Sequence, residues 1–464
     1  MLTAMKETTQ IVVIGGGLCG SLLALRLAQR GYKVDVYEGR PDLRTTDISA
    51  GRSINLALSD RGLKALRLAG VEEKVRKICI PMKGRLMHDV EGNTFESRYS
   101  GREGEYINSI SRGDLNGILL TEAEKHENVN MYFNQRCIHV DIEKKTATFE
   151  SYESKEQYKV SADVIFGTDG AGSALRKSYE EQFPDFKVSQ EFLTHGYKEL
   201  EIPGIKGKHQ ISKDHLHIWP RGSYMLIALP NMDGSFTVTL FLSYSEGEFH
   251  FENLTSKEKI IEFFKRDFPD SLELIPDILH EFETNPTGKL GTVKCNPWAY
   301  KGNTLLMGDA AHAIVPFYGQ GMNASFEDVA ELDAVIDTHE KLGKLNWSMV
   351  FDEFQKERKK NADAIADLAI DNYYEMRDHV ANESFIKKRR IEMALERNFP
   401  SQYASKYSLV TFNEHIGYYQ AMTQGRIQDQ VLLSMIKKDE VNEDSSLEDV
   451  LKKVLEETAK RMMS

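Results

Sequence analysis

The chain has 464 residues, of which 41% are hydrophobic and 28% are charged. This composition is typical of a folded globular protein and excludes the collagen-like and disordered classes. The formal charge is −12, from 59 lysines and arginines against 71 aspartates and glutamates. Nucleic acid is therefore not an expected partner, because basic surfaces bind a phosphate backbone. The four cysteines are scattered and form no close pairs, so we expect a reducing, cytoplasmic compartment.

Neither a membrane anchor nor a metal site is predicted. The early uncharged stretch, residues 8–25, contains several glycines and fits a strand, a turn and a helix better than a membrane span. His215 and His217 would share one face of a strand, but no third ligand accompanies them. The sequence leaves the oligomeric state open.

The N-terminal region predicts a βαβ unit. A strand over residues 11–14 leads into a glycine-rich turn, and a helical pattern follows as far as Arg30. Residues 33–37 have the pattern of a second strand, and Glu38 follows it directly.

The middle of the chain predicts a change from α/β to β structure. We expect a helix over residues 108–124 and a short buried strand over 163–166. Between about residues 195 and 243, alternating apolar side chains and a turn at 230–234 predict an antiparallel sheet. Such a sheet would be inserted between the halves of an α/β domain.

The C-terminal third predicts mainly helices. A strand over residues 304–307 comes first, and helical periodicity dominates from Gly321 to about Leu395. The remaining C-terminal residues are charged and also have a helical pattern. No internal repeat or linker rich in proline or serine separates these regions, so we expect interleaved domains.

The pattern Gly15-x-Gly17-x-x-Gly20 has the strand and the helix that a dinucleotide-binding turn requires. Gly15 permits the tight turn, Gly17 lets a pyrophosphate approach the backbone, and Gly20 allows close packing of the helix. The first amides of that helix, from Leu18 onward, would face the phosphates. Glu38 lies where a carboxylate accepts hydrogen bonds from ribose hydroxyls and repels a 2′-phosphate. The motif therefore predicts FAD or NAD, not NADP, and does not decide between the first two.

Two later segments resemble motifs of the flavoprotein aromatic hydroxylases. Residues 163–176 are similar to the Asp-Gly motif of that family, and residues 305–312 are similar to its Gly-Asp motif. Both lie at the ends of predicted strands, where ligands bind in open α/β sheets. The resemblance implies non-covalently bound FAD, with Asp169 in the first motif and Asp309 hydrogen-bonded to the ribitol chain. It also implies that Arg112 contacts a phosphate of FAD.

Residues 316–323 form a glycine-bearing loop that opens a long predicted helix. The N-terminus of a helix directed at the flavin would favour negative charge on the reduced ring by about 1 kcal/mol. We expect Phe317 and Tyr318 to form a pocket wall there, and no side chain is expected to act as nucleophile or general base, because the flavin supplies the reactive oxygen. The residues expected to bind the cofactor are Gly15, Gly17, Leu18, Gly20, Glu38, Arg40, Ala57, Arg112, Asp169, Asp309, Gly321, Met322 and Asn323.

Several segments resemble the kynurenine 3-monooxygenases, a branch of this family. The similarity extends from Ile11 to about Gln430, and the segments are residues 51–58, 82–88, 195–200, 217–220, 236–241 and 315–323. In that branch an arginine and a tyrosine hold the carboxylate of the substrate, and the matching residues are Arg85 and Tyr99. An asparagine and a second tyrosine also meet the amino-acid end, and these match Asn372 and Tyr407. Arginine suits a bidentate carboxylate contact, and tyrosine adds a directional hydroxyl.

The resemblance implies an FAD-dependent monooxygenase of tryptophan degradation. Its expected reaction converts L-kynurenine to 3-hydroxy-L-kynurenine with NADPH and O2, through a flavin C4a-hydroperoxide. NADPH is expected as a transient co-substrate, because no second nucleotide motif exists and Glu38 disfavours a 2′-phosphate. Two alternatives stay open: a flavin hydroxylase of another aromatic acid, and a flavin-bearing interaction protein without turnover.

The predicted fold class is α/β. We expect a Rossmann-like FAD-binding domain of the aromatic-hydroxylase type, an inserted antiparallel β-sheet substrate domain and a helical C-terminal region. The expected boundaries are 1–75, 105–185 and 290–375 for the discontinuous FAD-binding domain, 76–104 and 186–289 for the sheet domain, and 376–464 for the helical region.

Overall fold

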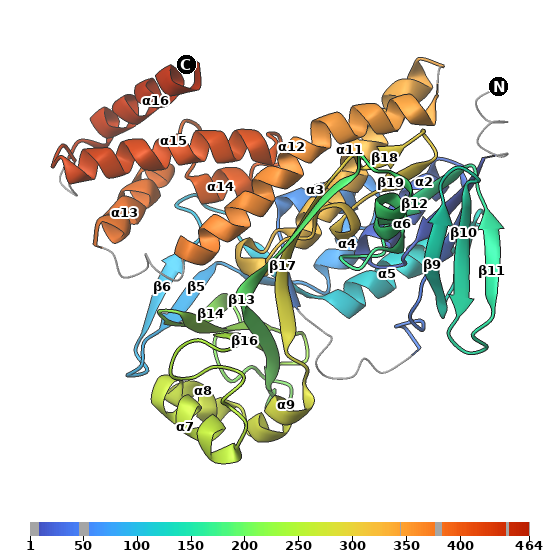
Figure 1. Cartoon of the computed structure of the whole chain (residues 1–464). Helices are drawn as coiled ribbons and strands as arrows, with labels where there is room; N and C mark the ends of the chain where they lie inside the picture. Colours follow the sequence, from blue (N-terminus) through green and yellow to red (C-terminus); the bar gives the residue numbers. More distant parts are fainter. Residues whose placement is uncertain (1–8, 46–54, 344, 376–382, 442–444, 464) are drawn as a thin grey trace. The chain divides into compact units, whose positions relative to one another are not determined.

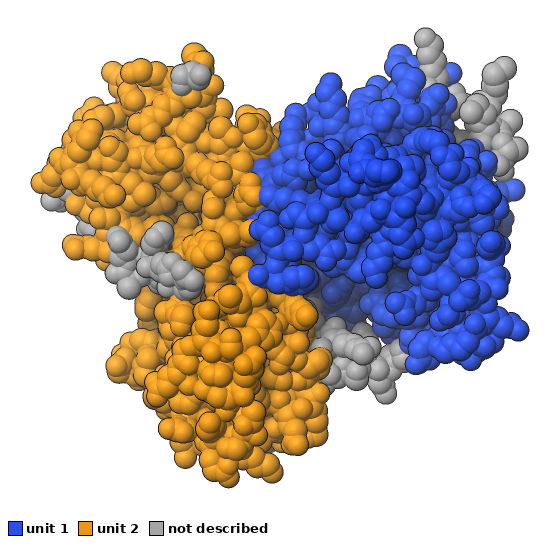
Figure 2. Space-filling view, viewed as in Figure 1, with its two compact units in different colours: residues 1–78, 110–192, 291–366 blue, residues 79–109, 193–290, 367–464 orange. Residues whose placement is uncertain are grey.

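The structure, a computed structural model, describes residues 9–45, 55–343, 345–375, 383–441 and 445–463. The first four residues of the segment 51–58 therefore lie outside the described part. The chain forms two compact units, which are coloured separately in Figure 2. Unit 1 comprises residues 1–78, 110–192 and 291–366, and unit 2 comprises residues 79–109, 193–290 and 367–464.

Unit 1 is built on a six-stranded sheet with the order β18-β19-β12-β1-β2-β8. All neighbouring strands are parallel except β18, which is antiparallel to β19. The central strands are almost wholly apolar and buried, as parallel strands covered on both faces must be. The strands are β1 (Gln10–Ile14), β2 (Lys33–Tyr37), β8 (Val129–Tyr132), β12 (Val164–Gly167), β18 (Ala299–Tyr300) and β19 (Thr304–Leu306).

Helices and a small second sheet complete unit 1 (Figure 1). The helices are α2 (Leu18–Gln29), α3 (Asp60–Leu68), α4 (Glu72–Arg76), α5 (Arg112–Glu124), α6 (Ala174–Gln182), α10 (Asp309–His312), the 3-10 helix η1 (Pro316–Tyr318), α11 (Gly321–Lys341) and α12 (Trp347–Tyr374). Strand β3 (Asn55–Leu58) leads into α3. The second sheet is antiparallel and contains β9 (Gln135–Asp141), β10 (Thr146–Ser151) and β11 (Gln157–Ser161).

Unit 2 is built on a seven-stranded sheet with the order β17-β13-β16-β15-β14-β5-β6. Strands β5 and β14 are parallel, whereas β5 and β6, and the run from β14 to β13, pair antiparallel. The strands are β5 (Gly84–His88), β6 (Thr94–Arg98), β13 (Lys187–Ile202), β14 (His215–Arg221), β15 (Tyr224–Pro230), β16 (Phe236–Ser243) and β17 (Gly288–Asn296), and β4 (Ile80–Met82) pairs with β7 (Ile107–Ser111). Strands β7, β13 and β17 and helix α12 contribute residues to both units.

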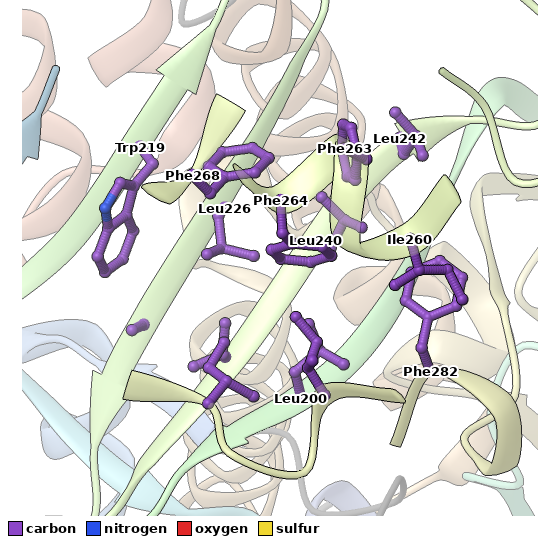
Figure 3. Close-up of a cluster of buried hydrophobic side chains, with 14 of the residues drawn as sticks. Leu200, Trp219, Leu226, Leu240, Leu242, Ile260, Phe263, Phe264, Phe268 and Phe282 are labelled. Carbon is purple, nitrogen blue, oxygen red and sulfur yellow. The ribbon is translucent and has the colours of Figure 1, made fainter. Parts of the chain in front are cut away.

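Buried hydrophobic side chains stabilise unit 2 and form two clusters among its described residues. One lies between the sheet and the helices α7 (Lys257–Asp267), α8 (Pro269–Leu274) and α9 (Ile278–Thr284), and Figure 3 shows Phe263, Phe264 and Phe268 within it. The other joins the C-terminal helices α13 (Glu383–Asn398), α15 (Tyr418–Lys437) and α16 (Leu447–Met463). Helix α14 (Lys406–Thr411) packs on α15.

The observed elements confirm the predicted α/β class with an inserted antiparallel sheet and a helical C-terminal region. One predicted boundary is wrong: residues 108–111 belong to β7, and the helix begins only at Arg112. Ile107 and Ile110 are buried β-branched residues of the strand, and Ser111 caps the helix by accepting a hydrogen bond from the Asp114 amide (3.2 Å). Strands β9–β11 and helices α7–α9 were not predicted.

The expected domain boundaries stay a prediction, and the compact units divide the chain at other positions. The helices after residue 367 group with the inserted sheet in unit 2, whereas the sequence suggested a separate region from residue 376. Within the described residues, no helix combines the length and the apolar character needed to cross a membrane.

We expect Phe264→Ala to destabilise unit 2. The Phe264 side chain is wholly buried in the core of Figure 3, and its removal leaves a cavity that costs about 3 to 5 kcal/mol of unfolding free energy. Urea unfolding followed by tryptophan fluorescence measures the loss. Phe95→Ala is the control, because Phe95 is 54% exposed. Equal losses in the two variants would contradict the assignment of this core.

Candidate functional site

The turn between β1 and α2 is possible only with glycine at two positions. Gly15 has φ +98°, and a Cβ there would lie 2.6 Å from the Thr168 carbonyl oxygen. A Cβ at Gly20 would lie 1.9 Å from the carbonyl oxygen of Gly15. Gly17, in contrast, meets only the end of the Arg40 side chain at 3.9 Å, so its backbone can be approached. Helix α2 begins at Leu18 without a capping side chain, and its first amides can therefore bind an anion.

Glu38 is fixed at the end of β2 by donors on both carboxylate oxygens. Oε2 accepts from the Gly16 amide (2.8 Å), and Oε1 accepts from the amide and the Nε of Arg40 (both 2.9 Å). Burial opposes ionisation, but the hydrogen bonds from Arg40 and Gly16 lower the pKa of Glu38 below its usual value. The predicted ribose acceptor is thus an ionised carboxylate beside the glycine turn.

Asp169 follows β12 and carries an acceptor without a donor. Its Oδ2 accepts a hydrogen bond from the Ala174 amide (2.6 Å). Its Oδ1 is buried and has no hydrogen-bond partner in the described part of the chain. Burial raises the pKa of Asp169 above its usual value. A buried acceptor of this kind is satisfied when a ligand supplies a hydroxyl or amide donor.

Helix α5 is tied to the glycine turn by a residue that the sequence did not single out. Asn116 donates from Nδ2 to the Gly16 carbonyl oxygen and to Ser21 Oγ, at 3.1 Å in each case. Arg112, one turn earlier, is exposed at the start of the helix. The predicted phosphate ligand therefore lies on a helix that is hydrogen-bonded to the glycine turn.

The Gly-Asp motif presents Asp309 outward from a buried helix. Asp309 is exposed, whereas the next three residues of α10 are buried. Gly308 has φ +57°, and a Cβ there would meet Cys19 Sγ at 3.1 Å and Ser325 Oγ at 3.2 Å. Gly308 is therefore packed between α2 and α11 in a conformation that favours glycine, and this backbone directs Asp309 away from the core.

Asn323 holds two backbone segments at the start of α11. Its Nδ2 donates to the carbonyl oxygens of Ala57 (2.8 Å) and Gly319 (2.9 Å), and its Oδ1 accepts from the Ser59 amide (3.0 Å). The structure thus brings together two of the predicted cofactor residues, Ala57 and Asn323. The helix that begins with Gly321 and Met322 has no side-chain cap, so its first amides are available to a partly anionic ligand.

Phe317 and Tyr318, the predicted wall residues, form η1 just before that helix. Both are buried, with 8% and 5% exposure. Their burial places two aromatic rings next to the loop that carries Gly319 (φ +67°).

These features of unit 1 fit a flavin dinucleotide. Strands β1, β12 and β19 are parallel neighbours, so their carboxyl ends meet at one edge of the sheet. The glycine turn, Asp169 and Asp309 follow those ends directly. The edge therefore offers helix amides for phosphates and carboxylates for hydroxyl groups, which is the donor and acceptor set that FAD requires.

Unit 2 contains an arginine beside two stacked tyrosines. The rings of Tyr99 and Tyr407 are nearly parallel (11°), with their centroids 5.4 Å apart. The guanidinium carbon of Arg85 lies 5.5 Å from the Tyr99 centroid and 5.1 Å from the Tyr407 centroid. Cation–π attraction thus holds the arginine against two aromatic faces. The structure thus brings Tyr407, from the C-terminal region, against Arg85 and Tyr99. The resemblance assigns all three residues to the amino-acid end of the substrate.

The two tyrosines differ in exposure. Tyr99 is 2% exposed, and its Oη has no hydrogen-bond partner among the described residues. Burial and the neighbouring Tyr407 raise the pKa of Tyr99 well above its usual value, against the opposing effect of Arg85. Tyr407 is only partly buried. The cluster therefore combines a fixed positive charge with a neutral phenol.

Glu396, on α13, accepts hydrogen bonds from the backbone near both Tyr99 and Tyr407. Its Oε2 accepts from the Gly101 amide (2.9 Å), and its Oε1 accepts from the Ser405 amide (2.8 Å). Gly101 lies two residues after Tyr99, and Ser405 caps the helix that carries Tyr407. Sequence reasoning missed Glu396, because nothing in the local pattern distinguishes it from other acidic helix residues.

Asn372 is buried near the end of α12. Its neighbours fix the helix within unit 2. Tyr373 Oη lies 3.1 Å from His195 Nδ1, and Arg426 donates to Asp371 Oδ2 (2.7 Å). The predicted role of Asn372 at the amino-acid end of the substrate stays a prediction.

Among the described residues, no group of three or more histidine, cysteine, aspartate or glutamate side chains could hold a metal ion. His217 instead hydrogen-bonds to His88 (2.8 Å) and to the Ser212 carbonyl oxygen (2.7 Å).

Comparisons with known proteins agree with this geometry. A family described as FAD binding domain matches residues 8–369. The chain is 46% identical over 433 residues to the kynurenine 3-monooxygenase of Myxococcus xanthus, covering 93% of this chain and 91% of that protein. It is 44% identical over 453 residues to the enzyme of that name from Flavobacterium johnsoniae, covering 97% and 99%. The relative from Dictyostelium discoideum is 44% identical over 450 residues, covering 95% of each chain.

Solved structures show the same fold at low sequence identity. The structure of 2-methyl-3-hydroxypyridine-5-carboxylic acid oxygenase has a TM-score of 0.64 and 20% identity, covering 84% of this chain and 98% of that one. PqsL of Pseudomonas aeruginosa, in complex with 2-aminobenzoylacetate, has a TM-score of 0.64 and 16% identity, covering 80% and 97%. The predicted resemblance and fold class are both confirmed.

We expect Gly20→Ala to weaken FAD binding and to destabilise unit 1. Its Cβ would press on the Gly15 carbonyl oxygen at 1.9 Å and on Thr168 Oγ1 at 2.5 Å, so the turn must shift. Gly117→Ala is the matched control, because that position lies inside α5 and its nearest contact is an ordinary 3.5 Å. Flavin fluorescence titration of the apoproteins, with thermal melting, measures both effects. Wild-type FAD affinity in Gly20→Ala would contradict the role of the turn.

Proposed function

The chain belongs to the kynurenine 3-monooxygenase family of FAD-binding proteins, and we propose that it hydroxylates L-kynurenine to 3-hydroxy-L-kynurenine with NADPH and O2. The observation that carries the choice of substrate is the cluster of Arg85 with Tyr99 and Tyr407. A guanidinium binds a carboxylate through two charge-assisted hydrogen bonds, and the aromatic faces exclude water around it.

The amino-acid end of kynurenine fits this cluster in charge and shape. Arg85 would pair with the α-carboxylate, and the unsatisfied Tyr99 hydroxyl would supply a second hydrogen bond to it. Asn372 would contact the same end of the substrate through its amide. Holding this end fixes where the aromatic ring can lie, and such positioning accounts for much of the rate enhancement in a reaction between two bound species.

FAD would be held by the residues at the sheet edge of unit 1. The turn amides from Gly17 to Leu18 and the Arg112 guanidinium would take the phosphates, Glu38 the ribose, and Asp309 the ribitol chain. When bound and reduced, the flavin supplies the activated oxygen that is transferred to the substrate ring. The chain itself is then required to orient the two molecules and to exclude water.

We propose that NADPH is a transiently bound co-substrate that reduces the flavin. Glu38 is ionised and sits at the ribose position of the dinucleotide turn, where it would repel a 2′-phosphate. NADPH is therefore expected to bind elsewhere and to leave after hydride transfer. We further propose a cytoplasmic location, because all four cysteines are free thiols.

The direct experiment is product identification. Protein reconstituted with FAD is incubated with NADPH, O2 and L-kynurenine, and the products are separated by chromatography and identified by mass. The proposal predicts 3-hydroxykynurenine in step with NADPH consumption. Turnover of anthranilate or a phenol in place of kynurenine would indicate a different aromatic hydroxylase, and no NADPH consumption with any of them would indicate a protein without turnover.

We expect Arg85→Ala to weaken kynurenine binding by roughly 10- to 100-fold, because a charge-assisted pair is lost. Arg85→Lys should restore only part of the kynurenine affinity, since lysine lacks the planar guanidinium group that binds a carboxylate through two hydrogen bonds. Arg98→Ala is the control: Arg98 lies on β6, and its side chain is 65% exposed. Spectral titration of the bound flavin with kynurenine gives the affinities. An unchanged kynurenine affinity in Arg85→Ala would refute the assignment of Arg85 to the substrate carboxylate.

The Tyr99→Phe variant distinguishes a role of the Tyr99 hydroxyl in kynurenine binding from a role in the stability of the protein. The hydroxyl of Tyr99 is buried and has no hydrogen-bond partner among the described residues, so its removal should leave the melting temperature of the substrate-free protein unchanged or raised. Kynurenine affinity should nevertheless fall by about two- to tenfold, the value of one hydrogen bond. Melting curves with and without kynurenine test both statements. A variant that melts lower and binds kynurenine normally would show that the hydroxyl has only a structural role.

A further inference from the structure

Unit 1 contains a cluster of buried charged side chains that the proposed function does not use. Arg61 of α3 donates to Glu327 Oε1 (2.7 Å), and Arg358 of α12 donates to Glu327 Oε2 (2.5 Å) and Asp328 Oδ1 (2.6 Å). These four side chains are between 0% and 4% exposed. Burying charges is unfavourable unless every charge has its partners in place, and each of these four side chains has at least one.

Asp328 connects the cluster to the Gly-Asp motif. Its Oδ2 accepts a hydrogen bond from the Gly308 amide (2.8 Å) and another from His312 Nε2 (2.6 Å). Gly308 precedes α10 and His312 is the last residue of that helix. One carboxylate therefore fixes both ends of the short helix whose first residue is Asp309.

The donor set requires an ionised carboxylate at this position. Three donors converge on the two oxygens of Asp328, and a carboxylate is the side chain that accepts at both oxygens and donates at neither. Burial alone would raise the pKa of Asp328, but the facing His312 and Arg358 lower it below its usual value. An asparagine side chain has the same shape as an aspartate, but its NH2 group would face one of the three groups that donate to Asp328.

The cluster also fixes α11 against its neighbours. Arg358 donates to the Ala324 carbonyl oxygen (2.8 Å) in the first turns of α11. Ala324 follows Asn323, which holds the segments of Ala57 and Gly319. The Asp309 segment and the N-terminus of α11 thus share one buried network.

We propose that Asp328 is a positioning residue for the flavin: held by Arg358, it sets the orientation of the α10 segment and so the strength with which Asp309 binds the cofactor. This inference rests on the proposed FAD site. Asp328 acts through Gly308 and His312 and does not itself touch the cofactor. Removing its charge should therefore loosen FAD even where the protein remains folded.

The test measures FAD binding to apoprotein by quenching of flavin fluorescence, without kynurenine or NADPH. Asp328→Asn should raise the dissociation constant for FAD by about tenfold or more, the usual effect of losing hydrogen bonds to a charged group. Arg358→Lys keeps the positive charge but loses the planar guanidinium group, so we expect a smaller rise in the dissociation constant for FAD. Because the readout is FAD alone, a failure of kynurenine hydroxylation would leave this result unaffected.

Asp333→Asn is the matched control for lost stability. Asp333 lies on the same helix, is 7% exposed, and its carboxylate is held by Arg26 (3.1 Å) and Arg30 (2.6 Å). Its contacts do not reach the Gly-Asp motif, so the dissociation constant for FAD should stay within about twofold of wild type although the melting temperature falls. An equal rise in the Asp333→Asn protein would overturn the proposal, because it would show a general effect of instability.

A double-mutant cycle tests whether Asp328 acts through Asp309. If it does, adding Asp328→Asn to Asp309→Ala should weaken FAD binding far less than it does in the wild-type background. Fully additive effects would overturn the proposed route. If Asp328→Asn does not fold, Arg358→Lys takes its place in the cycle, and wild-type FAD affinity in that variant would also overturn the proposal.

Discussion

The parallel pairing of β1, β12 and β19 is the constraint on which the rest of the cofactor site depends. Parallel strands end at the same edge, so three segments separated by more than a hundred residues deliver a glycine turn, Asp169 and Asp309 to one place. Close packing at Gly20 and Gly308 further restricts how these segments lie. The polar groups at this edge are those that a flavin dinucleotide needs.

Buried carboxylates perform the same structural task in each unit. In unit 1, Asp328 accepts from both ends of the helix that presents Asp309. In unit 2, Glu396 accepts from the amides of Gly101 and Ser405 and so holds the segments of Tyr99 and Tyr407. In both cases a charged acceptor on a helix fixes irregular backbone that carries ligand-binding groups. A charge is suited to this task because hydrogen bonds to ionised groups are stronger than those between neutral groups.

The sequence predicted the parts of the structure that local geometry determines. The glycine turn after β1 and the position of Asp309 after β19 follow from a strand, a special backbone conformation and a helix that are adjacent in the chain. Asn116, Asp328 and Glu396 could not be predicted, because each acts on a segment that is distant in the sequence and looks like an ordinary polar helix residue. The helix predicted over residues 108–124 began too early because Ser111 both ends strand β7 and caps helix α5. The periodicity of the sequence alone does not show where the strand ends and the helix begins.

We propose that Arg85 recognises the carboxylate of kynurenine. Spectral titration of the bound flavin can compare kynurenine with its decarboxylated analogue, in the wild-type and Arg85→Ala proteins. The wild type should prefer kynurenine by about tenfold or more, and this preference should largely disappear in Arg85→Ala, since only the carboxylate interacts with the guanidinium. The same preference in both proteins would contradict it.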